Sequence, residues 1–357
     1  MDIVRRKSRV VKVGGVLIGG KNPVVIQSMT KTRTSDVENT VRQINQLKDA
    51  GCQIVRLAIN DLDDAVSLKQ IKPRVKLPLV ADIHFDWRLA IAAIESGADK
   101  IRLNPGNIDK KKDVETVISA LKSAGIPLRI GLNSGSVKSV DSKRSLMSQK
   151  LVSSCMNYIK MVEGLKFHNL VISLKANNVL DTLEAYRKIS RVCDYPLHLG
   201  LTATGSVYNG IIKSSVALGA LLLEGIGDTI RVSLTENPLE EVRAAKSILE
   251  SLGLRNFGPQ VISCPTCGRC KVNLVGIVKE LEDRLSVINY STWLRPVKLA
   301  IMGCVVNGPG EAKEADIGVA FGKDQGVLFK QGKIVRKIFP KDCVRVLLKE
   351  LKTKEKT

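Results

Sequence analysis

The sequence predicts an α/β protein: an N-terminal (β/α)₈ TIM barrel followed by a smaller α+β domain. From residue 23 to residue 250 one unit recurs, a short β-branched apolar run followed by a polar turn and a longer stretch with helical spacing. The spacing of about 30 residues between runs is that of a βαβ unit. Aromatic residues make up only 4% of the chain. The core must therefore be built from Val, Ile, Leu and Ala, as buried parallel strands require.

Eight such units match a closed barrel, and a doubly wound open sheet is the alternative. The residues before position 23 are predicted to form a short hairpin that closes the bottom of the barrel. The first helix is expected to begin with a capping box made by Ser35 and Glu38. The eight predicted strands cover residues 23–28, 53–59, 79–83, 100–103, 127–132, 169–174, 197–201 and 228–232.

The strand–helix repeat ends after residue 250, where Gly253, Gly258 and Pro259 interrupt the apolar pattern. We therefore divide the chain into a barrel, residues 1–255, and a second domain, residues 256–357. The second domain is predicted to hold a strand ending at Ser263, a helix over 274–285, strands over 297–302 and 317–320, a hairpin turning at 331–332, and a last amphipathic helix.

The chain carries 56 Lys and Arg against 35 Asp and Glu, a formal net charge of +21. Such a surplus attracts anions. No window reaches the roughly 18 apolar residues that a membrane helix needs, and no secretory leader follows the basic N-terminus. We expect a cytoplasmic protein that does not contact a membrane. In that compartment the eight cysteines are not expected to form structural disulfides. Cys52, Cys155, Cys193 and Cys343 are interpreted as small buried side chains.

Polar side chains lie within or directly after the predicted strands, toward the end of a barrel where active sites lie. Five of them are cations. Arginine offers a planar fork that matches phosphate oxygens, so a cluster of cations at one mouth predicts a ligand with more than one phosphate. The five are Arg56, Arg102, Arg129, Lys175 and Arg231.

A second site is predicted in the C-terminal domain. Cys264 and Cys267 stand at the Cys-x-x-Cys spacing of a metal site, and Cys270 follows three residues later. Cys304 lies alone in a loop rich in Gly and Pro. No separate Cys-x-x-Cys or His pair stands at the distance needed to complete a zinc knuckle, so an iron–sulfur cluster is favoured over zinc. Spacing alone leaves open whether the cluster takes Cys270, Cys304 or both.

Seven segments carry a specific resemblance over nearly the whole chain. The most specific is the loop MGCVVNGPGE at 302–311. Together the segments closely resemble the 4-hydroxy-3-methylbut-2-en-1-yl diphosphate synthase family of the non-mevalonate isoprenoid pathway, in its short bacterial form. The other six are 27–30 (QSMT), 81–86 (ADIHFD), 101–107 (IRLNPGN), 129–133 (RIGLN), 224–233 and 264–269 (CPTCGR).

The resemblance implies one [4Fe-4S] cluster in a domain of the sulfite and nitrite reductase type. The matching metal ligands are Cys264, Cys267, Cys304 and Glu311. Cys270 has no counterpart among those ligands and is interpreted as a bystander thiol. A carboxylate oxygen leaves iron more readily than a thiolate does. Glu311 is therefore also the expected catalytic residue, because it can give way to the substrate.

The implied substrate is 2-C-methyl-D-erythritol 2,4-cyclodiphosphate, which is opened reductively with loss of water to (E)-4-hydroxy-3-methylbut-2-enyl diphosphate. The resemblance implies an oxidoreductase acting on CH or CH₂ groups, with flavodoxin or ferredoxin as electron donor, that works as a head-to-tail homodimer. The implied substrate contacts are Arg56, Asp82, Arg102, Asn104, Arg129, Asn133, Lys175, Thr202, Arg231 and Ser233 in the barrel and Asn307 in the second domain.

One segment departs from the family pattern. Many members carry Thr-Glu-Ala-Gly after the seventh strand, whereas this chain has Thr202-Ala203-Thr204-Gly205. Either Thr204 or a water takes the role of the glutamate, or that carboxylate is dispensable. Two other functions remain as alternatives: a barrel transferase of the pteroate synthase kind with a structural metal domain, and a basic nucleic-acid-modifying protein. The latter is disfavoured because aromatic residues do not interleave with the basic ones.

Overall fold

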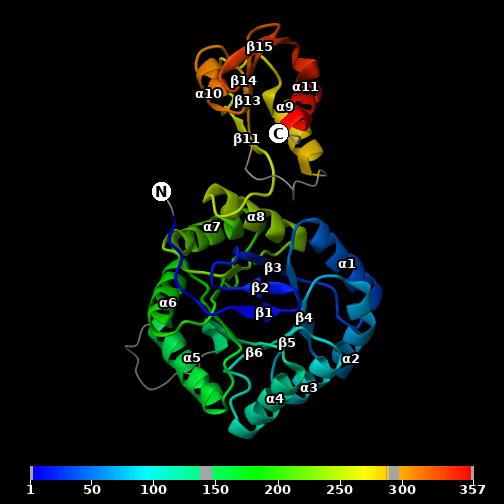
Figure 1. Ribbon diagram of the computed structural model, residues 1–357, viewed down its shortest axis with the longest axis vertical. Helices are drawn as coiled ribbons and strands as arrows, with labels where there is room; N and C mark the ends of the chain where they lie inside the picture. The colour runs from blue at the N-terminus through cyan, green and yellow to red at the C-terminus, as the bar shows by residue number, and fades with distance from the viewer. Residues whose placement is uncertain (1–2, 137–146, 287, 289–296, 355–357) are drawn as a thin grey trace. The chain divides into compact units, whose positions relative to one another are not determined.

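Eight parallel strands form a barrel in the first unit, Met1–Arg255, of the computed structural model (Figure 1). The structure describes residues 3–136, 147–286, 288 and 297–354. The strands pair in the order β8-β7-β6-β5-β4-β3-β10-β9, and a parallel bridge between Ile172 and Leu197 joins the two ends. This closure confirms the barrel and excludes the open sheet. The strands are β3 (Val25–Met29), β4 (Ile54–Ile59), β5 (Leu79–Ile83), β6 (Lys100–Leu103), β7 (Leu128–Asn133), β8 (Leu170–Lys175), β9 (His198–Leu199) and β10 (Thr229–Ile230).

The last two strands are shorter than the sequence predicts. β9 and β10 hold two residues each, where five were expected over 197–201 and over 228–232. The ladder stops at Gly200, whose backbone passes so close to its neighbours that a Cβ would lie 2.7 Å from both the Arg231 carbonyl oxygen and Lys175 Nζ. The residues after β9 therefore shape the barrel mouth instead of extending the sheet.

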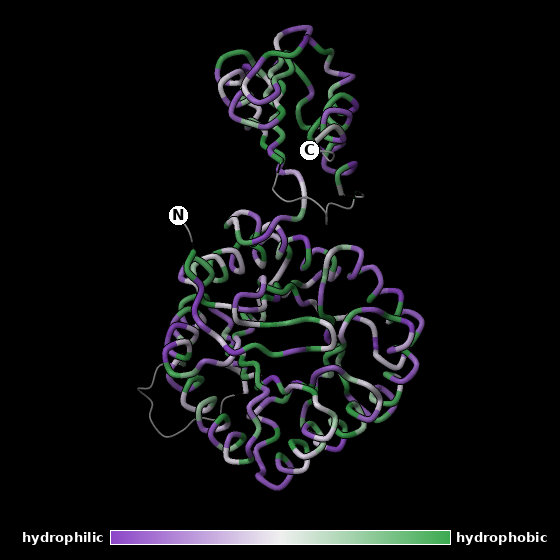
Figure 2. Tube along the Cα trace, viewed as in Figure 1, coloured by the Kyte–Doolittle hydropathy of each residue, from purple (hydrophilic) through white to green (hydrophobic). Residues whose placement is uncertain are grey.

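A ring of helices surrounds the barrel, with apolar faces turned inward and polar faces outward, as the hydropathy colouring of Figure 2 shows. The predicted capping box is wrong. The first helix is capped by Asp36, whose side chain accepts from the Asn39 amide, while Glu38 pairs outward with Arg74. The helices are α1 (Val37–Asp49), α2 (Leu62–Ile71), α3 (Trp87–Glu95), α4 (Lys111–Ala124), α5 (Met147–Gly164), α6 (Val179–Val192), α7 (Val207–Leu223) and α8 (Pro238–Ser251).

A hairpin closes one end of the barrel, as the sequence predicts. β1 (Val11–Val13) and β2 (Val16–Ile18) pair antiparallel and cross the opening inside the helix ring in Figure 1. Their buried side chains pack against the first inward residues of four barrel strands, Val25, Ile54, Val80 and Val171. This apolar plug fills the N-terminal end and leaves the carboxyl end of the strands for a ligand site.

The second unit, Asn256–Thr357, is built on a five-stranded sheet in the order β11-β12-β13-β14-β15. The first three strands are parallel and the last two antiparallel. The short helix α10 (Gly308–Glu314) was not anticipated, because its Gly-Pro-Gly start suggested only a loop. The likeness to sulfite and nitrite reductase domains stays a prediction. The elements are β11 (Gln260–Ser263), α9 (Leu274–Ser286), β12 (Lys298–Met302), α10, β13 (Ile317–Phe321), β14 (Gly326–Lys330), β15 (Lys333–Ile338) and α11 (Cys343–Lys354).

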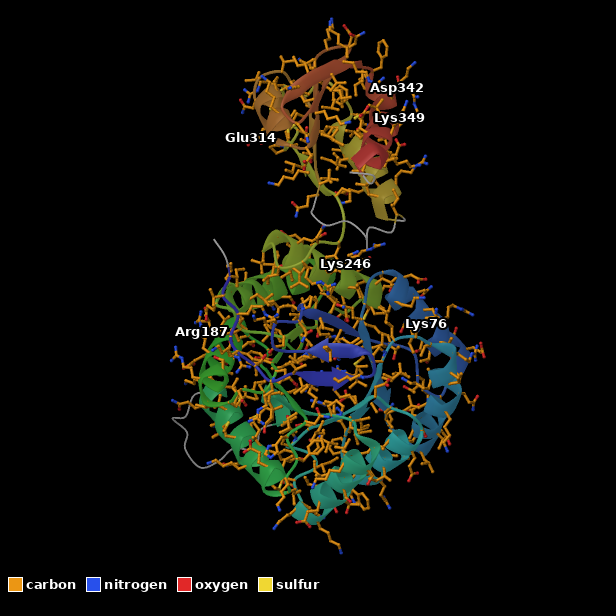
Figure 3. The ribbon with its side chains drawn as sticks, in the orientation of Figure 1. Lys76, Arg187, Lys246, Glu314, Asp342 and Lys349 are labelled. Atoms are coloured by element: carbon orange, nitrogen blue, oxygen red, sulfur yellow. The ribbon has the colours of Figure 1, made fainter. Side chains whose placement is uncertain are left out.

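Much of the surface charge lies away from the barrel axis. Lys76 and Arg187, labelled in Figure 3, point outward from the helix ring. Arg187 forms an ion pair with Glu224 there. Among the described residues no helix is both long and apolar enough to span a bilayer.

Candidate active site and metal centre

A cavity of about 240 Å³ opens at the carboxyl ends of the barrel strands. Its wall is almost entirely polar and charged, and it collects residues from strands that are far apart in the sequence. Most of the barrel residues implied by the resemblance line it, and His84, Leu201 and Ala203 join them. The lining residues are Arg56, Asp82, His84, Arg102, Asn133, Lys175, Leu201, Thr202, Ala203, Arg231 and Ser233.

Asp82 holds two arginines at the mouth. Its Oδ1 accepts from Arg102 Nη1 at 2.9 Å, and its Oδ2 lies 3.5 Å from Arg56 Nε. Burial alone would raise the pKa of this carboxyl, but the charges of Arg56 and Arg102 outweigh burial and hold the pKa well below its usual value. Arg102 also donates from Nη2 to the carbonyl of Gly131, where a Cβ would lie 2.6 Å from the guanidinium. Glycine at 131 is therefore required for Arg102 to lie across the mouth.

Arg231 is held by Glu241, a residue that the sequence analysis missed. The carboxylate of Glu241, 1% exposed, accepts from Arg231 Nη2 at 3.0 Å and Nε at 3.2 Å. It also accepts from the Ser28 hydroxyl at 2.9 Å and the Leu234 amide at 3.1 Å. Because Glu241 lies in the first turn of α8, its sequence context resembles an ordinary acidic helix start, which gives no signal of a buried role.

Two of the implied substrate contacts in the barrel, Arg129 and Asn104, lie outside the lining of the cavity. Arg129 is 1% exposed, and its Nε and Nη1 atoms have no hydrogen-bond partner among the described residues. Burial and the charges of Arg56 and Arg102 hold the pKa of Arg129 well below its usual value. Asn104 instead organises a loop: its Oδ1 accepts from the Gly106 amide at 3.1 Å and the Ser136 hydroxyl at 3.2 Å.

The segment that departs from the family pattern lies at the cavity wall. Thr202 and Ala203 line the cavity, and Ala203 has φ +54°, a left-handed conformation that non-glycine residues rarely adopt. Thr204 is buried, and its hydroxyl donates to the carbonyl of Ser233. The proton of this hydroxyl is therefore already used in a hydrogen bond within the protein.

A second cavity, of about 300 Å³, lies within the C-terminal unit. It opens where β11 and β12 end and α10 begins. All four implied metal ligands line it, together with Asn307 and Arg269. The full lining is Ile262, Ser263, Cys264, Pro265, Cys267, Arg269, Met302, Cys304, Asn307, Gly308 and Glu311.

Cys304 and Cys270 differ in their surroundings. The backbone amides of Val306, Asn307 and Gly308 point toward the Cys304 sulfur and lower its pKa, so its thiolate is favoured. Cys270 is absent from the lining, and its thiol donates to the carbonyl of Val272 at 3.3 Å.

Among the described residues, no three His, Cys, Asp or Glu side chains lie close enough together to hold a single metal ion. The chemistry of the donors in the second cavity fits the implied iron–sulfur cluster, which needs soft ligands that surround it. Three soft thiols and one carboxylate around a 300 Å³ cavity meet that requirement.

Comparison with known proteins decides the family. The model of the GcpE TIM-barrel domain matches residues 8–246, and that of the GcpE protein C-terminal domain matches residues 260–353. A protein of Lawsonia intracellularis named 4-hydroxy-3-methylbut-2-en-1-yl diphosphate synthase (flavodoxin) is 50% identical over 351 residues, which are 98% of this chain and 96% of that protein. The chain belongs to this synthase family. The family member of Bacillus subtilis, with the same name, is also 50% identical, over 97% of this chain and 91% of its own length.

Solved structures support the barrel of this family member. Dihydropteroate synthase from Xanthomonas albilineans in complex with 7,8-dihydropteroate superposes with a TM-score of 0.51 at 15% identity, over 70% of this chain and 100% of that one. The Yersinia pestis dihydropteroate synthase gives a TM-score of 0.50 at 13% identity, over 69% of this chain and 99% of that one. At such low identity the likeness shows a shared fold only. The transferase alternative gains no support from it.

Proposed function

We propose that this synthase-family member reduces 2-C-methyl-D-erythritol 2,4-cyclodiphosphate to (E)-4-hydroxy-3-methylbut-2-enyl diphosphate. The reaction breaks one ring C–O bond to the diphosphate and removes a hydroxyl group as water, and two electrons with two protons balance it. The observation that carries the proposal is the convergence of cations on one small polar cavity at the barrel mouth. The five cations outnumber the carboxylates Asp82 and Glu241 that pair with them, and a cyclic diphosphate matches the remaining positive charge.

Several cationic side chains offer hydrogen-bond donors to the diphosphate. Arg56, Lys175 and Arg231 line the cavity, and the Nε and Nη1 atoms of the buried Arg129 have no hydrogen-bond partner in the described part of the chain. Burial and the nearby arginines lower the pKa of Lys175 well below its usual value, and a bound anion would restore its charge. Asp82 and Glu241 do not bind the anion. They hold Arg102 and Arg231 in place before it arrives, which lowers the entropy lost on binding.

A [4Fe-4S] cluster held by Cys264, Cys267, Cys304 and Glu311 would supply the electrons one at a time. The chain provides the thiolates, with that of Cys304 favoured by backbone amides. Glu311 lies in the first turn of α10 and lines the same cavity. As an oxygen ligand it would hold iron less tightly than a thiolate and could give way to the substrate. Asn307 also lines that cavity, and its proposed role is a hydrogen bond to the substrate.

In this chain, the proposed donor of the proton that leaves with the hydroxyl group is a water molecule. The family glutamate is replaced by Ala203, and the Thr204 hydroxyl is already bonded to Ser233. Ala203 leaves room at the cavity wall where a water can bind.

The proposed electron donor is flavodoxin, which the names of the relatives carry in parentheses. Its acidic surface would suit the +21 charge of this chain. We further propose the head-to-tail homodimer of the family, in which the cluster unit of one subunit serves the barrel of the other.

The test is turnover by the anaerobically reconstituted protein with the cyclodiphosphate and reduced flavodoxin, followed by mass spectrometry of the product. Arg231→Gln is expected to lower kcat/KM at least about 100-fold, because it removes a charged contact to the substrate. The control variant is Arg187→Gln, which breaks the ion pair between Arg187 and Glu224 on the outer surface. It is expected to keep wild-type turnover. Absence of product with the wild-type protein would refute the proposal.

A further inference from the structure

His84 lies at the end of β5 and lines the mouth cavity. Its ring is held from both sides. Arg102 Nη1, which also donates to Asp82, lies 2.8 Å from His84 Nε2, and Asn107 Nδ2 lies 2.9 Å from His84 Nδ1. The Asp82 Oδ1 atom is 3.6 Å from Nε2. Four groups therefore face the ring: Arg102 from β6, Asp82 from β5, the amide of Asn107 in the loop after β6, and the ring of Phe85, whose centroid lies 6.1 Å from that of His84.

These contacts fix the tautomer of His84. A guanidinium can only donate, so Nε2 must accept from Arg102. A neutral imidazole that accepts at Nε2 carries its proton on Nδ1. Asn107 Nδ2 is a donor and cannot bond to Nδ1–H, which is also a donor. Turning the Asn107 amide by 180° exchanges its nitrogen and oxygen, and the oxygen then accepts from Nδ1–H. His84 thus acts as an acceptor for Arg102, locked in that role by Asn107.

The backbone after His84 is strained. The amide of Asp86 donates to the carbonyl of His84 at 2.8 Å, and Phe85 between them has φ +65°. A three-residue turn of this kind with positive φ is rare. The Phe85 side chain is 77% exposed, so packing of that side chain does not explain the strain. Strain of this type persists where it serves a site, and here the turn directs His84 into the mouth while Asp86 caps α3.

We propose that His84 is a positioning residue that sets the Arg102 guanidinium for the diphosphate substrate. His84 and Asp82 together take both N–H groups of Nη1, and Gly131 takes one of Nη2. Arg102 lines the mouth cavity, and among the described residues the second N–H of Nη2 makes no hydrogen bond, so the guanidinium keeps a donor for the anion. The inference rests on the proposed function for the identity of the substrate, but the positioning of an anion-binding arginine can be measured without turnover.

The experiment compares the reconstituted wild-type protein with His84→Ala, His84→Gln and the control His168→Gln. His168 contacts the Tyr195 hydroxyl near the start of β8, at the opposite end of the barrel. Two readouts are taken: KM and kcat for the cyclodiphosphate, and the dissociation constant for inorganic pyrophosphate by calorimetry. For His84→Ala we expect both KM and the pyrophosphate dissociation constant to rise about 10- to 100-fold, the effect of one hydrogen bond to a charged group, with kcat changed much less.

Glutamine can accept from Arg102 where Nε2 does, so His84→Gln is expected to recover most of the affinity, and His168→Gln to match the wild type. Wild-type affinity for pyrophosphate in His84→Ala would overturn the proposal. Loss of kcat in both His84 variants at unchanged KM would overturn it too, because that result identifies a proton donor. If the wild type binds pyrophosphate but turns over no cyclodiphosphate, the proposed function fails, while the pyrophosphate comparison still decides the role of His84.

The turn at Phe85 gives an independent test. Glycine adopts φ +65° freely, so Phe85→Gly is expected to keep wild-type pyrophosphate affinity. Valine is β-branched and is excluded from that region, so Phe85→Val must change the turn and displace His84. We expect Phe85→Val to weaken pyrophosphate binding by the same factor as His84→Ala. Equal affinities in the Gly and Val variants would contradict a positioning role for the turn.

Discussion

Arg102 Nη1 donates to Asp82 Oδ1 at 2.9 Å, and both side chains are less than a tenth exposed. The bond ties together two neighbouring barrel strands, β5 and β6, directly beneath the mouth cavity. A buried ion pair of this kind adds little net stability, but the loss of one partner leaves the other charge buried alone. Asp82 therefore links the integrity of the barrel to the anion site.

Asp82→Asn is expected to lower the free energy of unfolding by about 3 kcal/mol at neutral pH. The pKa of Asp82 is depressed in the folded protein, so its contribution is fully present above about pH 4 and is lost as the pH falls below that value. The difference between wild type and variant, measured by urea denaturation, should shrink in that range. The control is Asp194→Asn, which breaks the exposed pair with Arg9 and should cost under about 1 kcal/mol. Equal losses in the two variants would contradict this account.

Ala203→Gly is expected to stabilise the protein by about 1 kcal/mol, because Ala203 has φ +54° and glycine relieves the left-handed strain. The same exchange at Ala120 within α4 should destabilise by about 1 kcal/mol, as glycine does inside helices. Thermal or urea unfolding of both variants measures the change in the free energy of unfolding, which should be positive for Ala203→Gly and negative for Ala120→Gly. A loss of stability at position 203 would show that the turn there is not strained.

Lys100 is fully buried inside the barrel, and its Nζ has no partner among the described residues. Burial, together with Arg129 and Arg56, lowers its pKa well below the usual value. Lys100→Met should therefore raise the free energy of unfolding at pH 7, by about 2 kcal/mol. Because the unfolded lysine binds a proton that the folded one lacks, wild-type stability rises with pH, and the gain from the variant should fade toward pH 10. A gain that is constant with pH would mean that Lys100 is charged in the folded protein.

Periodicity predicted the barrel well because its strands are buried on both faces and its helices are amphipathic. The hairpin plug, the strands up to β8 and the sheet of the second unit follow the expected order. The ends of β9 and β10 were missed because a close contact at Gly200, which sequence does not reveal, stops the ladder. The helix α10 was missed because Gly and Pro at its start are read as a turn.

The site could be predicted where polar residues interrupt or directly follow an apolar strand, since such a position in a barrel strand points toward the mouth. Arg56 within β4, Asp82 within β5 and Arg231 directly after β10 are of this kind. Glu241 could not be found, because its role depends on how α8 packs against β10 and β3. His84 lay within the segment that carried the resemblance, but its link to Arg102 needs three-dimensional contact. The roles assigned to these residues stay predictions.

The cysteines give a paired prediction. Cys304→Ala is expected to lose most bound iron, because Cys304 lines the cavity and has amides that favour its thiolate. Cys270→Ala is expected to keep it, because the Cys270 thiol is directed to the Val272 carbonyl. Iron content after identical anaerobic reconstitution measures both. Equal loss of iron in the two variants would overturn the choice of ligands.

The most direct test of the whole account is the visible spectrum and iron analysis of the wild-type protein purified and reconstituted without oxygen. The account predicts a broad visible absorption that bleaches on reduction and about four irons per chain. A colourless protein that retains zinc and takes up no iron would contradict it.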